Sequence, residues 1–217
     1  MSLQAVIFDL DGTLVDSLGD IASAMNDTLA AFELPTHPVP SYRMLVGEGV
    51  ANLVKRAVPE DRPELCDDVL AAFRVRYGEH LVDRTRPFHG VPDLLRGLLG
   101  RKLRLAVVSN KPDPATHRII DQLFPRTFSL VRGERAGMPR KPDPRAALEA
   151  AVELGARPET TAFVGDSAID MRTAGNAGML AVGVTWGYRD EAELRGGGAS
   201  LLTHHPAELL ELLVRHG

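Results

Sequence analysis

The chain has a single cysteine among its 217 residues, so no intrachain disulfide can form. Such sparing use of cysteine is typical of a protein in a reducing compartment. Cys66 lies in the segment 65–69, where we interpret it as a packed position on a helix rather than as a catalytic thiol.

Long apolar runs and long runs of like charge are also missing. No stretch approaches the ~20 apolar residues that a membrane-spanning helix needs, and no basic segment followed by an apolar one opens the chain as in a signal peptide. The formal net charge is only −4, and acids are interspersed among the arginines, so nothing indicates nucleic acid as a partner. We therefore expect a soluble, cytoplasmic protein that acts neither on nucleic acid nor at a membrane.

The chain does contain a regular alternation of strand-like and helix-like segments. Short apolar runs rich in β-branched residues recur, and in the second half of the chain helix-like segments of ordinary length separate them. These runs are residues 5–8, 103–108, 128–131, 161–164 and 180–184, with a last short strand at 200–202. Nearly continuous apolar runs are typical of parallel strands buried on both faces. The sequence thus predicts an α/β fold with a doubly wound, Rossmann-like parallel sheet.

The first two predicted strands are separated by residues 9–102, far more than the roughly a dozen that a crossover needs at minimum. Apolar residues spaced three and four apart form three helical stripes in this interval. The stripes are Leu18, Ile21, Met25, Leu29 and Phe32; Val50, Leu53, Val54 and Ala57; and Cys66, Val69 or Leu70, Phe73 and Tyr77. We expect an α-helical cap domain at residues 15–84, inserted into a core formed by residues 1–14 and 85–217, with a hinge at the two joints.

The first predicted strand leads into two carboxylates one residue apart, Asp9 and Asp11, followed by Gly12 and Thr13. Alternation along a strand places residues 9 and 11 on the same side. Two anions held so close either bind a divalent cation or split their pKa values, so that one stays ionised while the other carries a proton. Both outcomes indicate a reactive site.

Three further polar segments border later strands. Ser109 and Asn110 follow the second strand, Lys141 precedes a helix predicted at 144–154, and Asp166 and Asp170 follow the strand at 161–164. The carboxyl ends of parallel strands form one crevice, so we expect these segments to converge there. Carboxylates suit Mg²⁺. Lys141, one of only four lysines against twenty-one arginines, and the serine hydroxyl can neutralise a phosphoryl group.

Each segment has a simpler interpretation on its own. Asp-x-Asp-Gly also opens a Ca²⁺-binding loop, but the fifth and twelfth positions are here Thr13 and Asp20 and the motif follows a buried strand. Asp166-Ser167 is typical of a helix N-cap, Ser109-Asn110 of a turn, and Lys141-Pro142 of a loop. The combination of all four segments, in this order, carries the functional signal.

In this order the four segments resemble the motifs of the haloacid dehalogenase (HAD) superfamily, and the resemblance extends to a helical cap after the first motif. It implies Asp9 as a nucleophile that forms an aspartyl-phosphate, and Asp11 as the acid and then the base. The presence of Asp11 separates the chain from dehalogenases and from phosphonate-cleaving relatives, which lack the second aspartate.

The resemblance also implies the groups that hold the phosphate and the metal. Thr13, Ser109, Asn110 and Lys141 would bind the phosphoryl oxygens. Mg²⁺ would be held by Asp9, the backbone carbonyl of Asp11, Asp166 and Asp170, the last either directly or from behind a direct ligand.

Within the superfamily, residues 43–49, 166–171 with 176–179, and 184–188 are similar to segments of phosphoglycolate phosphatases. We therefore expect Arg43, Gly47, Glu48 and Gly49 of the cap to set substrate specificity. Glycines around Glu48 suit a loop that presents backbone N–H groups to a small anion, and Arg43 can meet a carboxylate. A helix–helix turn with a surface arginine is the alternative. We interpret residues 186–188 as packing at the edge of the core.

The resemblance implies a Mg²⁺-dependent phosphatase for a small phosphorylated metabolite, with 2-phosphoglycolate the first choice and the cap as a lid against water. A phosphosugar mutase, or a phosphatase for a sugar phosphate, nucleotide or pyrophosphate, would use the same motifs. A phospho-accepting receiver combines similar residues on a similar sheet, but receivers are short and uncapped and accept phosphate on a later strand. The oligomeric state is not indicated.

Overall fold

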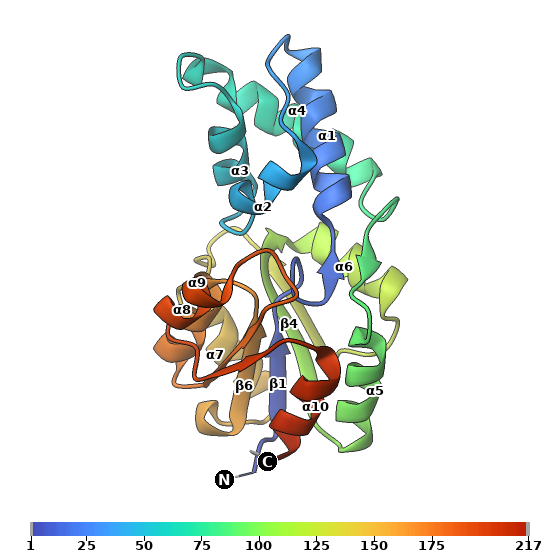
Figure 1. The fold of residues 1–217 in the computed structure, drawn as a ribbon, viewed down its shortest axis with the longest axis vertical. Helices are drawn as coiled ribbons and strands as arrows, with labels where there is room; N and C mark the ends of the chain where they lie inside the picture. The colour runs from blue at the N-terminus through green and yellow to red at the C-terminus, as the bar shows by residue number, and fades with distance from the viewer. Residues whose placement is uncertain (1, 216–217) are drawn as a thin grey trace.

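A computed structural model describes residues 2–215 (Figure 1). Its core is a six-stranded sheet with the strand order β5-β4-β1-β6-β7-β8, and every neighbouring pair is parallel. The strands are β1 (Ala5–Phe8), β4 (Arg104–Pro112), β5 (Leu130–Glu134), β6 (Thr161–Gly165), β7 (Leu180–Val184) and β8 (Leu201–Thr203). The predicted α/β fold with a parallel sheet is confirmed.

Helices cover both faces of this sheet, and the alternation of side chains along β1 shows how. Val6 and Phe8 belong to the same buried cluster as the apolar side of α5 (Val91–Gly100), α6 (Asp113–Leu123) and α10 (Pro206–Arg215). Ala5 and Ile7 pack on the other face with α7 (Arg145–Glu153), α8 (Ala168–Ala177) and α9 (Glu191–Gly196). A strand buried on both faces needs the uninterrupted apolar run that the sequence contains.

Strand β1 is also the switch point of the sheet. The chain proceeds from β1 through β4 to β5 on one side, and through β6 and β7 to β8 on the other. In open parallel sheets, the crevice outside the carboxyl ends of the strands at such a point is where ligands bind. The topology therefore places a candidate site beyond Phe8, between the ends of β4 and β6.

The helical insert stands over this end of the sheet (Figure 1). It comprises α1 (Leu18–Ala31), α2 (Tyr42–Leu45), α3 (Val50–Ala57) and α4 (Cys66–Glu79), with 3₁₀ turns at Val39–Ser41 and Pro63–Leu65. The three predicted helical stripes fall on α1, α3 and α4. The residues described include no helix long and apolar enough to cross a membrane.

Two short antiparallel strands, β2 (Val15–Asp16) and β3 (Arg86–Pro87), carry the chain into and out of the insert. The buried carboxylate of Asp20, on α1, ties the two passages together. It accepts hydrogen bonds from the backbone N–H groups of Arg84 (2.9 Å) and Thr85 (2.8 Å) and from the Thr85 hydroxyl (2.7 Å). The predicted boundaries at 15–84 lie beside this ribbon, and the movement of the insert as a lid stays a prediction.

Three local predictions differ from the structure. The strand predicted at 128–131 is β5, which is shifted to Leu130–Glu134. The strand predicted at 103–108 continues to Pro112, so Ser109, Asn110 and Lys111 lie inside β4 rather than after it, where its pairing with β5 is irregular. Strand β1 ends at Phe8, so alternation along a strand does not reach Asp9 and Asp11. Asp11 instead forms an isolated bridge with Val15 in the turn that follows.

Candidate active site

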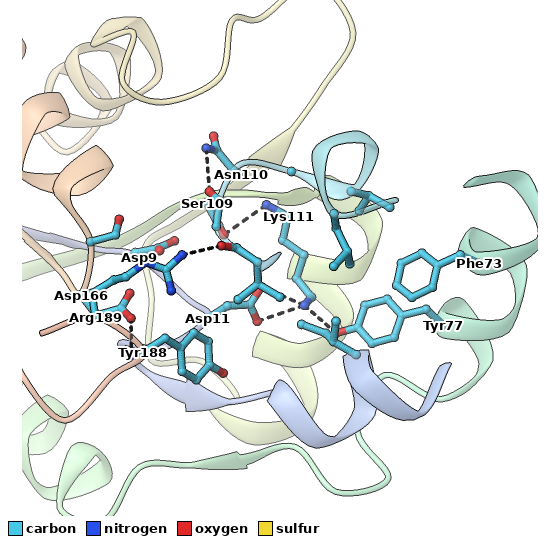
Figure 2. Close-up of a pocket in the computed structure, with 17 residues that line it drawn as sticks. Asp9, Asp11, Phe73, Tyr77, Ser109, Asn110, Lys111, Asp166, Tyr188 and Arg189 are labelled. Carbon is cyan, nitrogen blue, oxygen red and sulfur yellow. Dashed lines mark hydrogen bonds and ion pairs between the residues drawn. The ribbon is translucent and has the colours of Figure 1, made fainter. Parts of the chain in front are cut away.

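A cavity of about 60 Å³ lies where the carboxyl ends of β1, β4 and β6 meet the helical insert (Figure 2). Its core side is polar and is formed chiefly by Asp9, Asp11, Ser109, Asn110, Lys111 and Asp166. Its cap side is mostly apolar and is formed by Ile21, Val46, Val50, Leu53 and Phe73 with Tyr77. Residues more than 150 positions apart in sequence meet here, as the sheet topology predicts.

One carboxylate oxygen from each of Asp9, Asp166 and Asp170 lies within 4.8 Å of the other two. Burial raises the pKa of Asp9 from 3.8 to about 6; Lys141 opposes that rise, and Asp170 and Asp11 add to it. Burial, together with Asp170 and Asp9, also raises the pKa of Asp166 well above its usual range. Three acids at this spacing, two of them buried and Asp9 partly buried, repel one another unless a cation lies between them.

Asp9 Oδ1 is buried and lies 2.8 Å from Lys141 Nζ, and no other described residue donates a hydrogen bond to it. An ionised carboxylate has about four lone-pair sites on its two oxygens, so Asp9 can accept a cation besides Lys141. An oxygen-ligated divalent cation such as Mg²⁺ therefore fits the donor set of Asp9 and Asp166.

Lys141 lies behind the acids, with its side chain only 3% exposed. Its Nζ atom also donates to Asp170 Oδ1 at 2.7 Å. Burial alone lowers the pKa of Lys141, but Asp170 and Asp9 more than offset this and raise it, so the ammonium stays charged. The other oxygen of Asp170 accepts from the backbone N–H and the hydroxyl of Ser167, so both of its oxygens already have partners.

The Asp166 carboxylate is enclosed by two glycines. A Cβ atom on Gly12, whose φ is +83°, would lie 2.3 Å from Asp166 Oδ2, and one on Gly187 would lie 2.4 Å from Asp166 Cβ. The next residue, Tyr188, donates its backbone N–H to Asp166 Oδ2 at 2.7 Å. Trp186 donates its indole N–H to the Thr13 carbonyl at 3.0 Å. Residues 186–188 thus hold the acid and the first motif in place, a role beyond the packing that we expected of them.

Asp9 and Asp11 do not share one partner, because each has its own lysine. Lys111 Nζ donates to both oxygens of Asp11, at 3.0 and 2.9 Å, and to the hydroxyl of Tyr77 on α4 at 2.6 Å. The Ser17 hydroxyl also donates to Asp11 Oδ1, at 2.5 Å. The Asp11 carboxylate is not part of the group of three acids, and metal binding through the Asp11 backbone carbonyl stays a prediction.

The four predicted phosphate-binding residues fall into different places. Ser109 lines the cavity and Lys141 lies directly behind Asp9. The side chain of Asn110, although it lines the cavity, is engaged with backbone: its amide contacts the carbonyls of Gly47 and Lys141 and accepts from the Lys141 N–H. Thr13 is buried, and its hydroxyl has no partner among the described residues. Phosphate binding by all four stays a prediction.

The predicted specificity residues of the cap divide in the same way. Gly47 and Gly49 line the cavity with positive φ values of 115° and 84°. Arg43 is exposed and Glu48 pairs with Arg56 beside α3; neither belongs to the described lining. Their roles in specificity remain untested by the geometry.

The arginine that does line the cavity is Arg189, which the motifs did not reveal. It comes from the core, directly after Tyr188, and donates to the backbone carbonyls of Arg43 and of Val46 (2.8 Å). It therefore fastens the 43–49 loop of the cap onto the core. Tyr77 was also missed. Lys111, one of only four lysines, was recognised as part of the polar segment with Ser109 and Asn110 but was given no role.

Comparisons with known proteins agree with this geometry. The chain matches the haloacid dehalogenase-like hydrolase family over residues 6–184. It is 38% identical to a phosphoglycolate phosphatase of Chromobacterium violaceum, covering 97% of this chain and 96% of the relative. It is 33% identical to an N-acetylmuramic acid 6-phosphate phosphatase of Pseudomonas aeruginosa, covering 99% and 96%.

A solved structure of a candidate phosphoglycolate phosphatase from Lactobacillus delbrueckii subsp. bulgaricus has a TM-score of 0.93 to this chain at 31% identity, and the alignment covers 99% of both chains. The family match spans most of the sheet and the whole insert, and the relatives match end to end. The chain therefore belongs to the haloacid dehalogenase-like hydrolases, and within that family it is an enzyme that resembles the phosphoglycolate phosphatases.

Proposed function

We propose that the enzyme is a Mg²⁺-dependent phosphatase that hydrolyses a small phosphomonoester, 2-phosphoglycolate first, through a phosphorylated Asp9. The observation that carries this proposal is the cluster of Asp9, Asp166 and Asp170, in which Lys141 is the only described group paired with the buried Asp9 Oδ1. Mg²⁺ held by Asp9, Asp166 and the Asp11 carbonyl would supply positive charge against the phosphoryl oxygens.

Side chains of the protein carry out phosphoryl transfer in two steps. The Asp9 carboxylate attacks phosphorus while the bond to the ester oxygen breaks, and Asp11 gives that oxygen a proton. A water molecule then attacks the acyl phosphate, Asp11 takes back a proton, and inorganic phosphate leaves with Asp9 restored. Lys141 and Ser109 hold the phosphoryl oxygens during both steps, and Asp170 fixes Lys141 by the 2.7 Å contact.

The insert, residues 15–84, would act as the lid that excludes bulk water and selects the substrate, while the core fixes the reaction. The cavity is small, at about 60 Å³, which favours a compact leaving group over a sugar. The Pseudomonas aeruginosa relative suggests N-acetylmuramic acid 6-phosphate as a second candidate, and the lid would have to open further to admit it. Both candidate substrates carry a carboxylate in the alcohol part of the ester.

The test is phosphate release in the presence of Mg²⁺ from 2-phosphoglycolate, N-acetylmuramic acid 6-phosphate, hexose phosphates, a nucleoside monophosphate and pyrophosphate. A chelator and the Asp9→Asn variant serve as controls. Preferred release from 2-phosphoglycolate, lost in both controls, is the expected result. Preference for another ester would keep the phosphatase and replace the substrate. Conversion of a hexose phosphate into its isomer without phosphate release would identify a mutase instead.

A further inference from the structure

The cavity has two chemically different ends. Asp9 and Asp166 lie at one end and Phe73 at the other, with Asp11 between them (Figure 2). Lys141 pairs with Asp9 at the acidic end, and Leu53 also contributes to the apolar lining from the cap. A substrate whose phosphorus lies at Asp9 and whose ester oxygen lies at Asp11 extends its alcohol part toward the cap. The polar atoms on that side of the cavity belong to Lys111 and Tyr77.

We propose that Lys111 and Tyr77 together bind a carboxylate on the leaving group, and that they select phosphate esters of hydroxy acids over phosphate esters of neutral alcohols. The inference rests on the proposed phosphatase function and identifies the residues that bind the alcohol part of the substrate, away from the phosphate. It replaces Arg43, which we expected to meet a carboxylate, because Arg43 is exposed and does not belong to the described lining.

The geometry of the pair suits an anion. The Lys111 side chain is only 3% exposed, and its ammonium lies 4.8 Å from the centre of the Tyr77 ring. The ammonium forms an ion pair with the Asp11 carboxylate, 2.9 Å away. One N–H of the ammonium is directed at the Tyr77 oxygen, 2.6 Å away.

The Tyr77 hydroxyl supplies the second donor. Burial raises the pKa of Tyr77 to about 12, so the phenol keeps its proton. Its oxygen accepts from Lys111, while the hydroxyl proton itself has no acceptor among residues 2–215. Its ring stacks on Phe73 with centroids 5.3 Å apart, which fixes where the hydroxyl points. A carboxylate beside Tyr77 would receive the O–H hydrogen bond and lie next to the positive charge of Lys111, whose own N–H groups are directed at Asp11 and Tyr77. A hydrogen bond that involves a charged group is stronger than one between neutral groups.

Arg189, the other cation that lines the described part of the cavity, has its donors directed at the cap loop. The Arg189 guanidinium donates to the carbonyls of Arg43 and Val46 and lies 3.3 Å from Glu193. It is therefore engaged in holding the cap loop.

The apolar side chains around Lys111 and Tyr77 increase the discrimination against leaving groups that lack a carboxylate. A leaving group with hydroxyls but no carboxylate would place those hydroxyls against Leu53 and Phe73, where few partners exist. A site built to hydrogen-bond one group discriminates strongly against an analogue that lacks the group. A hydrogen bond to a charged group corresponds to a factor of about 10 to 100 in affinity.

The test uses two phosphonates that cannot be hydrolysed and that differ only at the far end. 3-Phosphonopropionate replaces the ester oxygen of 2-phosphoglycolate by a methylene group, and propylphosphonate replaces its carboxylate by a methyl group as well. Dissociation constants for both are measured by calorimetry with Mg²⁺ present, for the wild type and for Tyr77→Phe and Lys111→Met. Tyr77→Phe keeps the ring stack, so it reports on the hydroxyl even if Lys111→Met folds poorly.

Matched controls are available in the chain. Tyr42→Phe removes another cap hydroxyl, which donates to Asn26 away from the cavity, and Lys102→Met removes an exposed lysine. We expect the wild type to bind 3-phosphonopropionate at least about tenfold more tightly than propylphosphonate. Tyr77→Phe and Lys111→Met should lose most of that preference, and the two controls should retain it.

The outcomes separate this inference from the proposed function. Wild-type binding of both phosphonates with equal affinity, or equal weakening of both by Tyr77→Phe, overturns the inference and leaves the phosphatase standing. Binding of neither phosphonate overturns both proposals, because the site then does not bind the phosphonate group that the two compounds share.

Discussion

Asp9 Oδ1 lies 2.8 Å from Lys141 Nζ at the carboxyl end of the central strand, and this ammonium is the only described group paired with the buried oxygen. This arrangement neutralises the carboxylate while leaving a lone pair free for a metal or for attack on phosphorus.

Asp9→Asn tests the role of that oxygen directly. The substitution keeps the shape of the side chain but removes the nucleophilic charge, so we expect kcat to fall by about 10⁴-fold or more. Circular dichroism should be unchanged. Asp143→Asn is the control and should retain activity, because Asp143 pairs with Arg145 and does not belong to the cluster of Asp9, Asp166 and Asp170. Retained turnover in Asp9→Asn would remove Asp9 as the nucleophile.

Metal binding should depend on pH in a direction that the pKa shifts define. The folded-state pKa of Asp9 is raised from 3.8 to about 6, so in metal-free protein its contribution to stability is complete below about pH 4 and is lost as the pH rises through 6. Mg²⁺ needs the ionised acids, so it should restore stability mainly at high pH.

With Mg²⁺ at about 100 times its Kd, we expect Tm to rise by about 5–10 °C at pH 8 and by much less at pH 5. Differential scanning fluorimetry with and without a chelator measures this. Asp166→Asn should lose the rise at pH 8. An equal rise at both pH values would contradict the assignment of these acids as ligands.

Asp11→Asn should slow hydrolysis according to the leaving group. An acid matters most when the departing alkoxide is a strong base, so we expect a loss of about 10²–10⁴-fold with alkyl phosphates and a smaller loss with aryl phosphates. A plot of log kcat/KM against leaving-group pKa, for the variant and the wild type, measures the difference. Parallel lines for the two enzymes would argue against Asp11 as the acid.

The parts that the sequence predicted well are those that depend on local pattern. β1, β7, α1 and α3 follow apolar runs or stripes that have only one way to be buried, and parallel topology brings Asp9 and Asp166 together. β4 was predicted too short because the polar residues after Val108 break the apolar run, whereas pairing with β5 keeps them in the strand.

The parts that were missed depend on how the cap sits on the core. Tyr77 belongs to an apolar helical stripe, and nothing local indicates that its hydroxyl meets Lys111 from another domain. Arg189 follows a loop after β7, and its partners are backbone carbonyls, which leave no trace in the sequence. Contacts of this kind become visible only when the docking of the two units is known.

Arg189→Ala should loosen the docked cap. The guanidinium donates to two carbonyls of the cap, so its loss should lower kcat/KM by about 5- to 50-fold, with little change in Tm. Hydrogen exchange of the backbone N–H groups in residues 43–49 should become faster. Arg195→Ala removes an exposed arginine that pairs with Glu191 within α9 and should change neither quantity. Unchanged exchange in the Arg189 variant would mean that this residue does not hold the cap.

Gly187→Ala tests whether close packing around Asp166 is needed for metal binding. The added Cβ atom would lie 2.3 Å from the Gly12 carbonyl oxygen and 2.4 Å from Asp166 Cβ, and neither neighbour can yield without moving backbone or the acid itself. We expect a loss of about 1–3 kcal/mol in the free energy of unfolding from overpacking. Calorimetric Mg²⁺ affinity should fall by about tenfold or more because Asp166 is displaced.

Gly175→Ala is the matched control, since a Cβ atom there meets nothing within 4 Å and the residue lies inside α8. That variant should gain up to about 1 kcal/mol in stability from helix propensity and bind Mg²⁺ as the wild type does. If Gly187→Ala loses stability but keeps full Mg²⁺ affinity, the glycine serves the fold alone, and Asp166 is either held by other contacts or is not a ligand. A joint loss of stability and affinity, absent from the control, would tie the position of Asp166 to the turn that Gly187 makes possible.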